Sequence, residues 1–424
     1  MDERIMGTTA GHQDARHTEE DVTIRLVRKE DRGEISLTLP TTGGTPAVQV
    51  GDFSLPWRFL LRFLLAISFS LQMASSSSSS SAPSYEDIQV SFVYDFNDIH
   101  HAPKITTKCY PFQTIRSLKK ALTDEEWAYF NKESQFRHIF HLQCEDTLKM
   151  VPVSVLLHRA LKLEGNVKEL WFVLNGVPVR YSITEHAIIS GLNCEKYPKD
   201  WAERRGHVFR MKIFGPSKVT ISGALEKLHN TSTTDVEDRK RLAILILLGG
   251  VVDHGIKGND VIPNALVDMV ENLEFCEEFP WGRYTFDKIV DQILKMYASD
   301  PEPKNRWHCP GFVIPLMLLP FECVESLGAN GWYMDVEDVD PSCPRMCKKR
   351  IQPGLFVTHS NVMKRIGVTS RGIRSILQTE GEEVHILFNL HEDESNHPLN
   401  ITHQQDVCMS NLSEEKGISR PWHL

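Results

Sequence analysis

The chain has 424 residues, of which 41% are hydrophobic, 24% charged and 9% aromatic, enough for one large domain or for two ordinary domains with tails. This composition excludes a wholly disordered or fibrous protein. The 47 basic and 56 acidic side chains give a formal net charge of -9, so the surface as a whole is not polybasic. Any contact with nucleic acid must therefore come from a local patch.

The N-terminal segment, residues 1–84, is expected to lie outside the folded core. Residues 1–52 are polar with mixed charge and are predicted to be disordered. Residues 53–71 are apolar, but one proline and two arginines leave only nine consecutive apolar or small residues. Since a membrane-spanning helix needs about 20 residues, we expect no membrane anchor.

A serine-rich stretch, residues 74–84, follows Met73 and is typical of a flexible linker. Met73 rather than Met1 is therefore favoured as the biological start, with the upstream residues as a translated leader. A genuine disordered extension and a secretory signal are the alternatives, and the signal is disfavoured because it would begin about 50 residues into the chain.

From residue 85 to about residue 330 the pattern is globular and mostly helical. Thr123 with Glu126, and Thr234 with Glu237, have the spacing of capping boxes, and Gly165 is placed to end a helix. The hydrophobic spacing predicts helices over residues 123–140, 153–163, 185–190, 220–229, 234–252, 264–273 and 286–298.

Two apolar segments are expected to form the centre of this domain. The run at residues 242–252 is too short to cross a bilayer and predicts a buried helix. Residues 310–328 are equally apolar but contain Pro315 and Pro320, which predicts a kinked or segmented helix.

One β-hairpin is predicted. Strands at residues 169–174 and 179–183 flank Asn175-Gly176, a pair that supplies the positive φ angles of a type I′ turn. Trp171 and Val173 are expected to face the second strand, with Trp171 buried. Thr184 is expected to cap the short helix that follows, and Gly191 to end it in the left-handed conformation.

The fold class is therefore mainly α (α+β): a compact multi-helix domain with one hairpin, flanked by disordered segments. Residues 331–424 are expected to form acidic and basic loops, with one helix at residues 360–366 and a polar tail after residue 390. Nine scattered cysteines favour a reducing compartment. The basic cluster 348–350 weakly favours the nucleus over the cytoplasm.

Three segments, in this order, resemble the plant domain of unknown function DUF1985. They are FRHIFHL at residues 136–142, ELWFVLNGVPVRYSITEHAIISGLNC at residues 169–194 and EFPWGRYTFDKIV at residues 278–290. The middle block is the most specific, and the resemblance covers roughly residues 130–300 of the DUF1985-like domain 85–330.

The resemblance implies a setting in plant proteins that look derived from transposable elements. Some members carry a separate cysteine peptidase domain similar to Ulp1-type SUMO proteases, but the shared domain itself has no implied catalytic residues. We therefore expect a non-enzymatic accessory or interaction module. The alternative is a truncated portion of such a peptidase, with the catalytic domain absent from this chain.

No cofactor or catalytic centre is expected from the residues. A cysteine peptidase needs a histidine base and an acidic or amide orienter, and the chain lacks the corresponding motifs. His308, Cys309, Cys343 and Cys347 are side chains of the kinds that bind zinc, but they have no C-x2-C spacing, and adjacent His308 and Cys309 do not easily face one metal.

The remaining candidate is a basic segment, residues 199–218, in which rings alternate with cations. Such a mixture can place charges on phosphates and rings on bases, although a solvated connection between helices has the same composition. Protein and nucleic acid are both open as partners, and no small-molecule substrate is indicated. The candidate binding residues are Arg204, Arg205, Arg210, Lys212 and Lys218.

Overall fold

The computed structural model describes residues 25–28, 35–38, 91–94, 104–107, 109–143, 148–162, 168–253, 261–299, 306–329, 331–387 and 390. The chain divides into two units, residues 1–83 and 84–424. In the first unit, β1 (Arg25–Arg28) pairs antiparallel with β2 (Ile35–Thr38), so the prediction that residues 1–52 are disordered is wrong for these two segments. The apolar stretch 53–71, the serine-rich linker and the polar tail lie outside the described residues.

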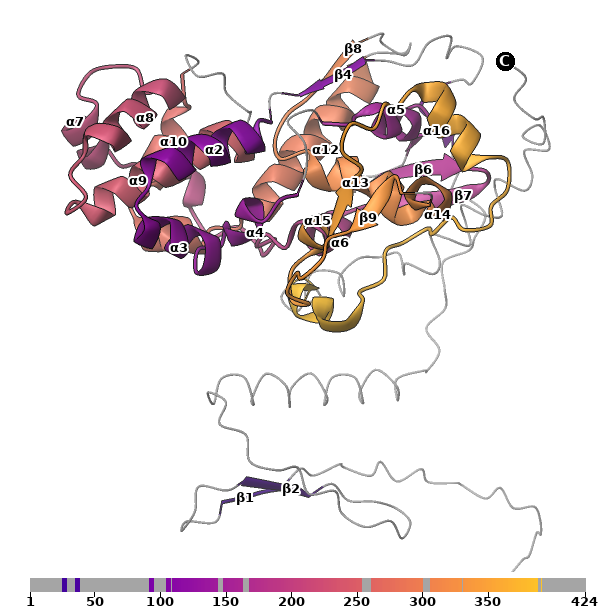
Figure 1. Cartoon of the computed structure of the whole chain (residues 1–424), viewed down its shortest axis with the longest axis horizontal. Helices are drawn as coiled ribbons and strands as arrows, with labels where there is room; N and C mark the ends of the chain where they lie inside the picture. Colours follow the sequence, from indigo (N-terminus) through magenta and orange to yellow (C-terminus); the bar gives the residue numbers. More distant parts are fainter. Residues whose placement is uncertain are drawn as a thin grey trace, which may run out of the picture. The chain divides into compact units, whose positions relative to one another are not determined.

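The second unit is mainly helical, which confirms the predicted fold class (Figure 1). Its helices are α2 (Pro111–Ala121), α3 (Asp124–Lys132), α4 (Arg137–Phe140), α5 (Val151–Leu157), α6 (Ile183–Ser190), α7 (Val208–Ile213), α8 (Ile221–Asn230), α9 (Val236–Leu247), α10 (Asn264–Met269), α11 (Leu273–Glu278), α12 (Trp281–Ser299), α13 (Ile314–Cys323), α14 (Glu325–Gly328), α15 (Arg345–Lys348) and α16 (His359–Ile366).

Short strands complete this unit. They are β3 (Ser91–Phe92), β4 (Lys104–Thr107), β5 (Leu161–Lys162), β6 (Leu170–Leu174), β7 (Val177–Tyr181), β8 (Arg306–Cys309), β9 (Tyr333–Asp335) and β10 (Lys349–Ile351). They pair as β3–β5, β6–β7 and β9–β10, all antiparallel, and β4–β8, which is parallel. Only the hairpin β6–β7 was predicted, because the other pairs join two- to four-residue segments that carry no period of their own.

The predicted hairpin and its turn are confirmed, but the second strand spans Val177–Tyr181 and not residues 179–183, because the two-residue turn lets the pairing resume directly after Gly176. Trp171 lies opposite Arg180 and Val173 opposite Pro178. Asn175 and Gly176 have φ angles of 49° and 81°, as a type I′ turn requires. Trp171 is buried, but on the face away from the main core, where Leu161, Val173 and the half-buried Phe92 and Ile376 surround it.

The cap of α6 differs from the prediction by two residues. Ser182, not Thr184, is the N-cap: its hydroxyl accepts from the Thr184 backbone N–H, and Glu185 accepts from the Ser182 backbone N–H at 2.9 Å. Ser182 occupies the extended conformation that a cap needs, whereas Thr184 is already helical. Gly191 ends the helix in the left-handed conformation with φ 64°, as predicted.

Three predicted helices have different bounds in the structure. The helix expected at residues 153–163 ends at Leu157, because Leu161–Lys162 pair with β3. The segment 264–273 forms two helices, since the Asn272 side chain caps α11 through the Phe275 N–H. The helix expected at residues 286–298 begins earlier, at Trp281. Thr285 therefore lies inside this helix, where its hydroxyl donates to the Gly282 carbonyl.

The first predicted helix also divides, into α3 and α4. The capping box of Thr123 and Glu126 is present as predicted. Glu126 also accepts from Arg239 at 2.6 and 2.9 Å, so a buried ion pair joins the start of α3 to α9.

The apolar run 242–252 is buried, as predicted, in α9 and the π-helical turn η4 (Leu248–Val252). The start of this helix was predicted one residue early, since Asp235 and not Thr234 is the N-cap. Asp235 makes no side-chain capping hydrogen bond, and Glu237 pairs with Arg241 at 3.0 Å instead of completing a capping box. Among the described helices, none has the length and apolar character needed to span a bilayer. The element α9 packs on α2 and α8 at one end of the unit (Figure 1).

The core continues beyond residue 330, where the sequence placed the end of the helical domain. Trp332, Met346, Val362 and Leu377 are buried in the same apolar cluster as α9 and α13. The segment 331–387 is therefore packed into the second unit. The sequence concealed this because the apolar residues are single ones spread through a polar stretch. The segmented helix at 310–328 is confirmed as α13 and α14, and the helix at 360–366 as α16.

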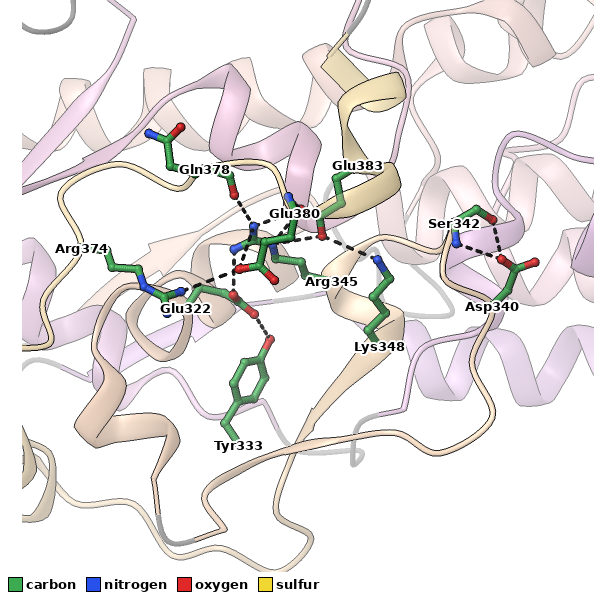
Figure 2. A network of polar contacts seen from close by, with 10 residues as sticks. All are labelled: Glu322, Tyr333, Asp340, Ser342, Arg345, Lys348, Arg374, Gln378, Glu380 and Glu383. Atoms are coloured by element: carbon green, nitrogen blue, oxygen red, sulfur yellow. Dashed lines mark hydrogen bonds and ion pairs between the residues drawn. The ribbon is translucent and has the colours of Figure 1, made fainter. Parts of the chain in front are cut away.

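A buried ion network fixes this C-terminal segment (Figure 2). Arg345 of α15 lies 3.0 Å from a carboxylate oxygen of Glu322 in α13 and 3.0 Å from one of Glu383 in the 3-10 helix η5 (Gly381–Leu387). Tyr333 donates to the other oxygen of Glu322 at 2.6 Å. Because these charges are buried, removal of one partner would leave the others unpaired, and the network thereby fixes the register of the segment.

Candidate functional site

The basic segment, residues 199–218, lies between the Gly191 end of α6 and the start of α8. It contains the 3-10 helix η3 (Trp201–Glu203) and α7, which lies at the end of the unit opposite the hairpin (Figure 1). Gly206 passes so close to the chain before α11 that a Cβ there would lie 2.6 Å from the Cβ of Glu271. The Phe209 N–H donates to the Glu271 carboxylate at 2.9 Å, so the segment is docked on the fold.

The aromatic rings of this segment pack inward. Phe209 and Phe214 are buried against each other with ring centroids 6.1 Å apart. Trp201 is half-buried, stacks on Tyr197 at 5.0 Å and meets Phe279 at 5.1 Å. These rings anchor the segment to the core, and their faces are therefore not free to stack on bases, as the nucleic-acid hypothesis required.

Two of the five predicted cations are engaged by their own surroundings. The Arg204 guanidinium carbon lies 3.8 Å from the centroid of the Phe275 ring, a cation–π contact. Arg205 donates to the carbonyl oxygens of Ala202, at 2.8 Å, and of Arg204, at 2.7 Å. Both side chains are exposed, so their charges still reach solvent.

The other three differ in exposure. Lys212 forms an ion pair with Asp238, which raises the pKa of the lysine, while its side chain stays 62% exposed. Arg210 is half-buried, and its Nε has no hydrogen-bond partner in the described part of the chain. Lys218 is exposed. The five cations thus lie on one segment, but in the structure they do not surround one common acceptor group.

An exposed apolar pair, which the sequence analysis missed, lies among these cations. Val208 is 65% and Met211 55% exposed. They are three residues apart on α7 and therefore share a face, next to Lys212. The residue types alone gave no signal, because exposed Val208 and Met211 are apolar like the buried Phe209 between them. Only the burial of each side chain in the structure distinguishes them. The surface is thus mixed, apolar and basic.

The four residues weighed as zinc ligands do not meet. His308 is exposed and Cys309 buried on β8, because consecutive strand residues point to opposite sides. Cys343 and Cys347 lie instead beside His138 of α4. In the residues that the structure describes, no group of three or more His, Cys, Asp or Glu side chains is placed to hold a metal ion.

The second and third sequence blocks are joined by polar and glycine contacts inside the core. Gly282 has no room for a side chain, since a Cβ would lie 2.4 Å from the Cys194 sulfur. The hydroxyl of Thr285 donates to the Gly282 carbonyl and accepts from His186 Nε2, which leaves Nδ1 to accept from Tyr181 at 2.8 Å. This network fixes the neutral tautomer of His186, and burial lowers its pKa to about 3.

Arg180 and Glu185 form the second buried polar contact of these blocks. Nε and Nη2 of Arg180 donate to both oxygens of Glu185 at 2.9 to 3.2 Å, and both side chains are almost fully buried. Glu185 is also the acceptor for the Ser182 cap. Arg180, Glu185 and Ser182 are thus engaged in buried contacts that stabilise the fold.

The comparisons with known proteins find a match to one family. Residues 157–292 match the family model of DUF1985, a domain of unknown function. The second and third sequence blocks lie within the match, and the first precedes it. The predicted resemblance is therefore confirmed, while its links to transposable elements and to SUMO peptidases stay predictions.

An uncharacterised protein of Arabidopsis thaliana is 22% identical over 293 residues, which are 69% of this chain and 34% of the relative. The chain therefore spans about a third of the length of the curated relative that it matches. No solved structure matches this chain.

Proposed function

We propose that this chain is a non-enzymatic interaction module that binds a protein partner through the exposed face of α7. The observation that carries the proposal is the pair Val208 and Met211, 65% and 55% exposed, next to Lys212 on a segment whose aromatic rings are packed inward. An exposed apolar pair flanked by cations fits a small contact surface with an apolar centre and a polar rim.

The surroundings of α7 indicate the chemistry of the partner. Exposed Arg204, Arg205 and Lys218 lie on the same segment and attract negative charge, while Val208 and Met211 require apolar side chains. A partner segment that alternates acidic and apolar residues satisfies both conditions. Such a segment would use charge for orientation and the apolar contact for affinity.

Nucleic acid is the second candidate partner. The exposed cations support it, since phosphate binding needs only accessible positive charge. It ranks below a protein partner because Phe209 and Phe214 are buried and Trp201 is packed on Tyr197 and Phe279. Any binding to nucleic acid would then be electrostatic and without base stacking.

The setting of the module is proposed from the resemblance and from the length of the relative. We propose an origin in a transposon-derived plant protein and a nuclear location. The match covers 34% of the Arabidopsis relative, which leaves room for a peptidase domain elsewhere in a longer protein, the alternative function. The basic cluster adds little support for nuclear import, because Lys348 ion-pairs with Glu383 and Lys349 covers the Tyr333 ring.

The test is a selection from a phage-displayed library of random 16-residue peptides against the full 424-residue chain. The double variant V208D/M211D serves for counter-selection, and V368D, at a 73% exposed valine outside the segment, is the matched control. We expect enriched peptides with net negative charge and apolar residues. Their affinity should fall at least tenfold for V208D/M211D and stay unchanged for V368D.

A parallel arm separates the two partners. Single- and double-stranded 20-nucleotide DNA is titrated in a shift assay at low and moderate salt, with wild type and with Arg204, Arg205, Arg210 and Lys212 changed to Glu. A complex that the fourfold change abolishes and that weakens steeply with salt would transfer the function to nucleic acid. A library that yields no peptide discriminating wild type from V208D/M211D would refute the α7 surface.

A further inference from the structure

Two thiols and an imidazole meet where α15 packs on α4. The Cys347 thiol donates to the His138 backbone carbonyl at 3.2 Å. The Cys343 side chain lies next to those of Cys347 and His138. Cys347 and His138 are buried, while Cys343 is half-buried and reaches the surface. This cluster is separate from the α7 surface and has no part in the proposed function.

The fold holds the turn that carries Cys343 from both sides. Before it, Ser342 donates its backbone N–H and its hydroxyl to Asp340 at 2.9 and 2.8 Å (Figure 2). After it, Arg345 is clamped by Glu322 and Glu383. Arg345 lies between Cys343 and Cys347 in the chain, so its ion pairs help to hold both cysteines in place.

The end of α6 completes the site. Gly191 lies so close that a Cβ there would be 2.7 Å from the Pro344 side chain and 3.0 Å from the His138 ring. Only a residue without a side chain allows Pro344, and with it Cys343, to approach His138. The Gly-Leu-Asn-Cys motif therefore contributes to the position of this thiol.

The side chains around Cys343 favour its thiolate. Its contacts with the Cys347 and His138 side chains lower the pKa of Cys343 to about 4. The other charged or titratable groups of the cluster are His141 and Arg137 on the α4 side, with Asp340 and Lys348 on the α15 side. Burial instead raises the pKa of Cys309 to about 12. The structure thus separates one reactive thiol from inert ones.

We propose that Cys343 and Cys347 form a redox-active pair that hydrogen peroxide oxidises reversibly to a disulfide. The accessible Cys343 thiolate attacks one peroxide oxygen, the O–O bond breaks, and the leaving hydroxide takes up a proton to give water, which leaves a sulfenic acid on Cys343. The Cys347 sulfur then attacks the Cys343 sulfur, the S–O bond breaks, and hydroxide departs as water with the Cys347 proton.

Oxidation has a local structural consequence. The Cys347 thiol loses its proton on forming the disulfide and no longer donates to the His138 carbonyl, which is one of the contacts between α15 and α4. A thiol reductant returns both cysteines to the reduced state. The cluster is therefore a site where peroxide changes the packing of the C-terminal segment.

The test treats the reduced full-length chain with hydrogen peroxide, blocks the remaining thiols with iodoacetamide and digests the chain with trypsin. Cleavage after Arg345 separates the two cysteines, so the disulfide joins the peptide of residues 346–348 to the peptide that ends at Arg345. We expect this linked pair in wild type and its loss after reduction. In C347S, dimedone should trap the sulfenic acid on Cys343, and in C343S neither product should form.

A second readout does not depend on oxidation. Alkylation of Cys343 by iodoacetamide should proceed at the same rate at pH 6 and pH 8, whereas the rate of an ordinary thiol rises about 70-fold over this range. Buried Cys309 serves as the internal control and should stay unmodified. A Cys343 rate that rises with pH like that of a free thiol, or peroxide treatment that gives neither the linked peptides nor the dimedone adduct, would overturn the proposal.

Discussion

The hairpin with α6 (residues 170–191) and the basic segment (199–218) follow each other in the chain but use polar residues in opposite ways. In the hairpin and α6, the side chains of Arg180, Glu185 and His186 are buried, and their hydrogen-bond partners lie inside the fold. In the second, Arg204 and Lys212 remain exposed while the rings are buried. A polar residue of these two stretches is therefore available to a partner only where it reaches solvent.

The largest expected effect breaks the buried ion pair of the first region. Glu185→Ala leaves the Arg180 guanidinium buried without its partner and removes the acceptor of the Ser182 cap, so the free energy of unfolding should fall by about 4 to 6 kcal/mol. Urea denaturation measures it. The exposed counterpart, Glu237→Ala, which removes a surface pair with Arg241, should change stability by less than about 1 kcal/mol.

Trp171→Ala tests the outer face of the hairpin. The indole is buried against Leu161 and Val173, and its Nε1 donates to Glu169 at 3.0 Å. Because the substitution leaves a large cavity, we expect a loss of about 3 to 5 kcal/mol. A loss below about 1 kcal/mol by thermal or urea unfolding would contradict this packing.

Acid should destabilise the first region through His186. Its pKa is about 3 in the fold, against about 6.5 for an unfolded histidine, so the unfolded state takes up the proton first as the pH falls. The contribution of neutral His186 to the free energy of unfolding is complete above pH 6.5. Below this pH, the free energy of unfolding decreases by about 1.4 kcal/mol per pH unit, or by about 2 to 3 kcal/mol at pH 4.5.

The variant His186→Gln isolates that contribution. The substitution should lower the free energy of unfolding at pH 7. Between pH 7 and pH 4.5, however, the variant should lose about 2 to 3 kcal/mol less of this free energy than wild type. His207→Gln, at an exposed position of the basic segment, should follow the wild-type curve. Parallel curves for wild type and His186→Gln would show that His186 does not titrate as described.

The smallest effect is expected on α7. Val208→Ser and Met211→Ser should each change the free energy of unfolding by less than about 0.5 kcal/mol, because these side chains are exposed. Phe209→Ala, between them, should cost about 3 kcal/mol or more, since the ring is buried. If all three variants were equally destabilising, α7 would be a packed helix and not a surface.

Elements with local signals could be predicted from the amino-acid sequence alone. The Asn175-Gly176 turn, the Thr123 capping box and the Gly191 terminus appear as predicted, because each depends on the backbone conformation of a few adjacent residues. The apolar run 242–252 was also recognised as buried, since its hydrophobicity excludes any exposed face.

Contacts between distant residues decided the rest. The strand pairs β3–β5 and β4–β8, the core beyond residue 330 and the approach of Cys343 to His138 each join segments that are separated by tens to hundreds of residues. No local pattern encodes such pairs. Of the candidate site, the sequence located the basic segment, whereas only the tertiary structure separated exposed Val208 and Met211 from buried Phe209, because burial is a property of the packed chain.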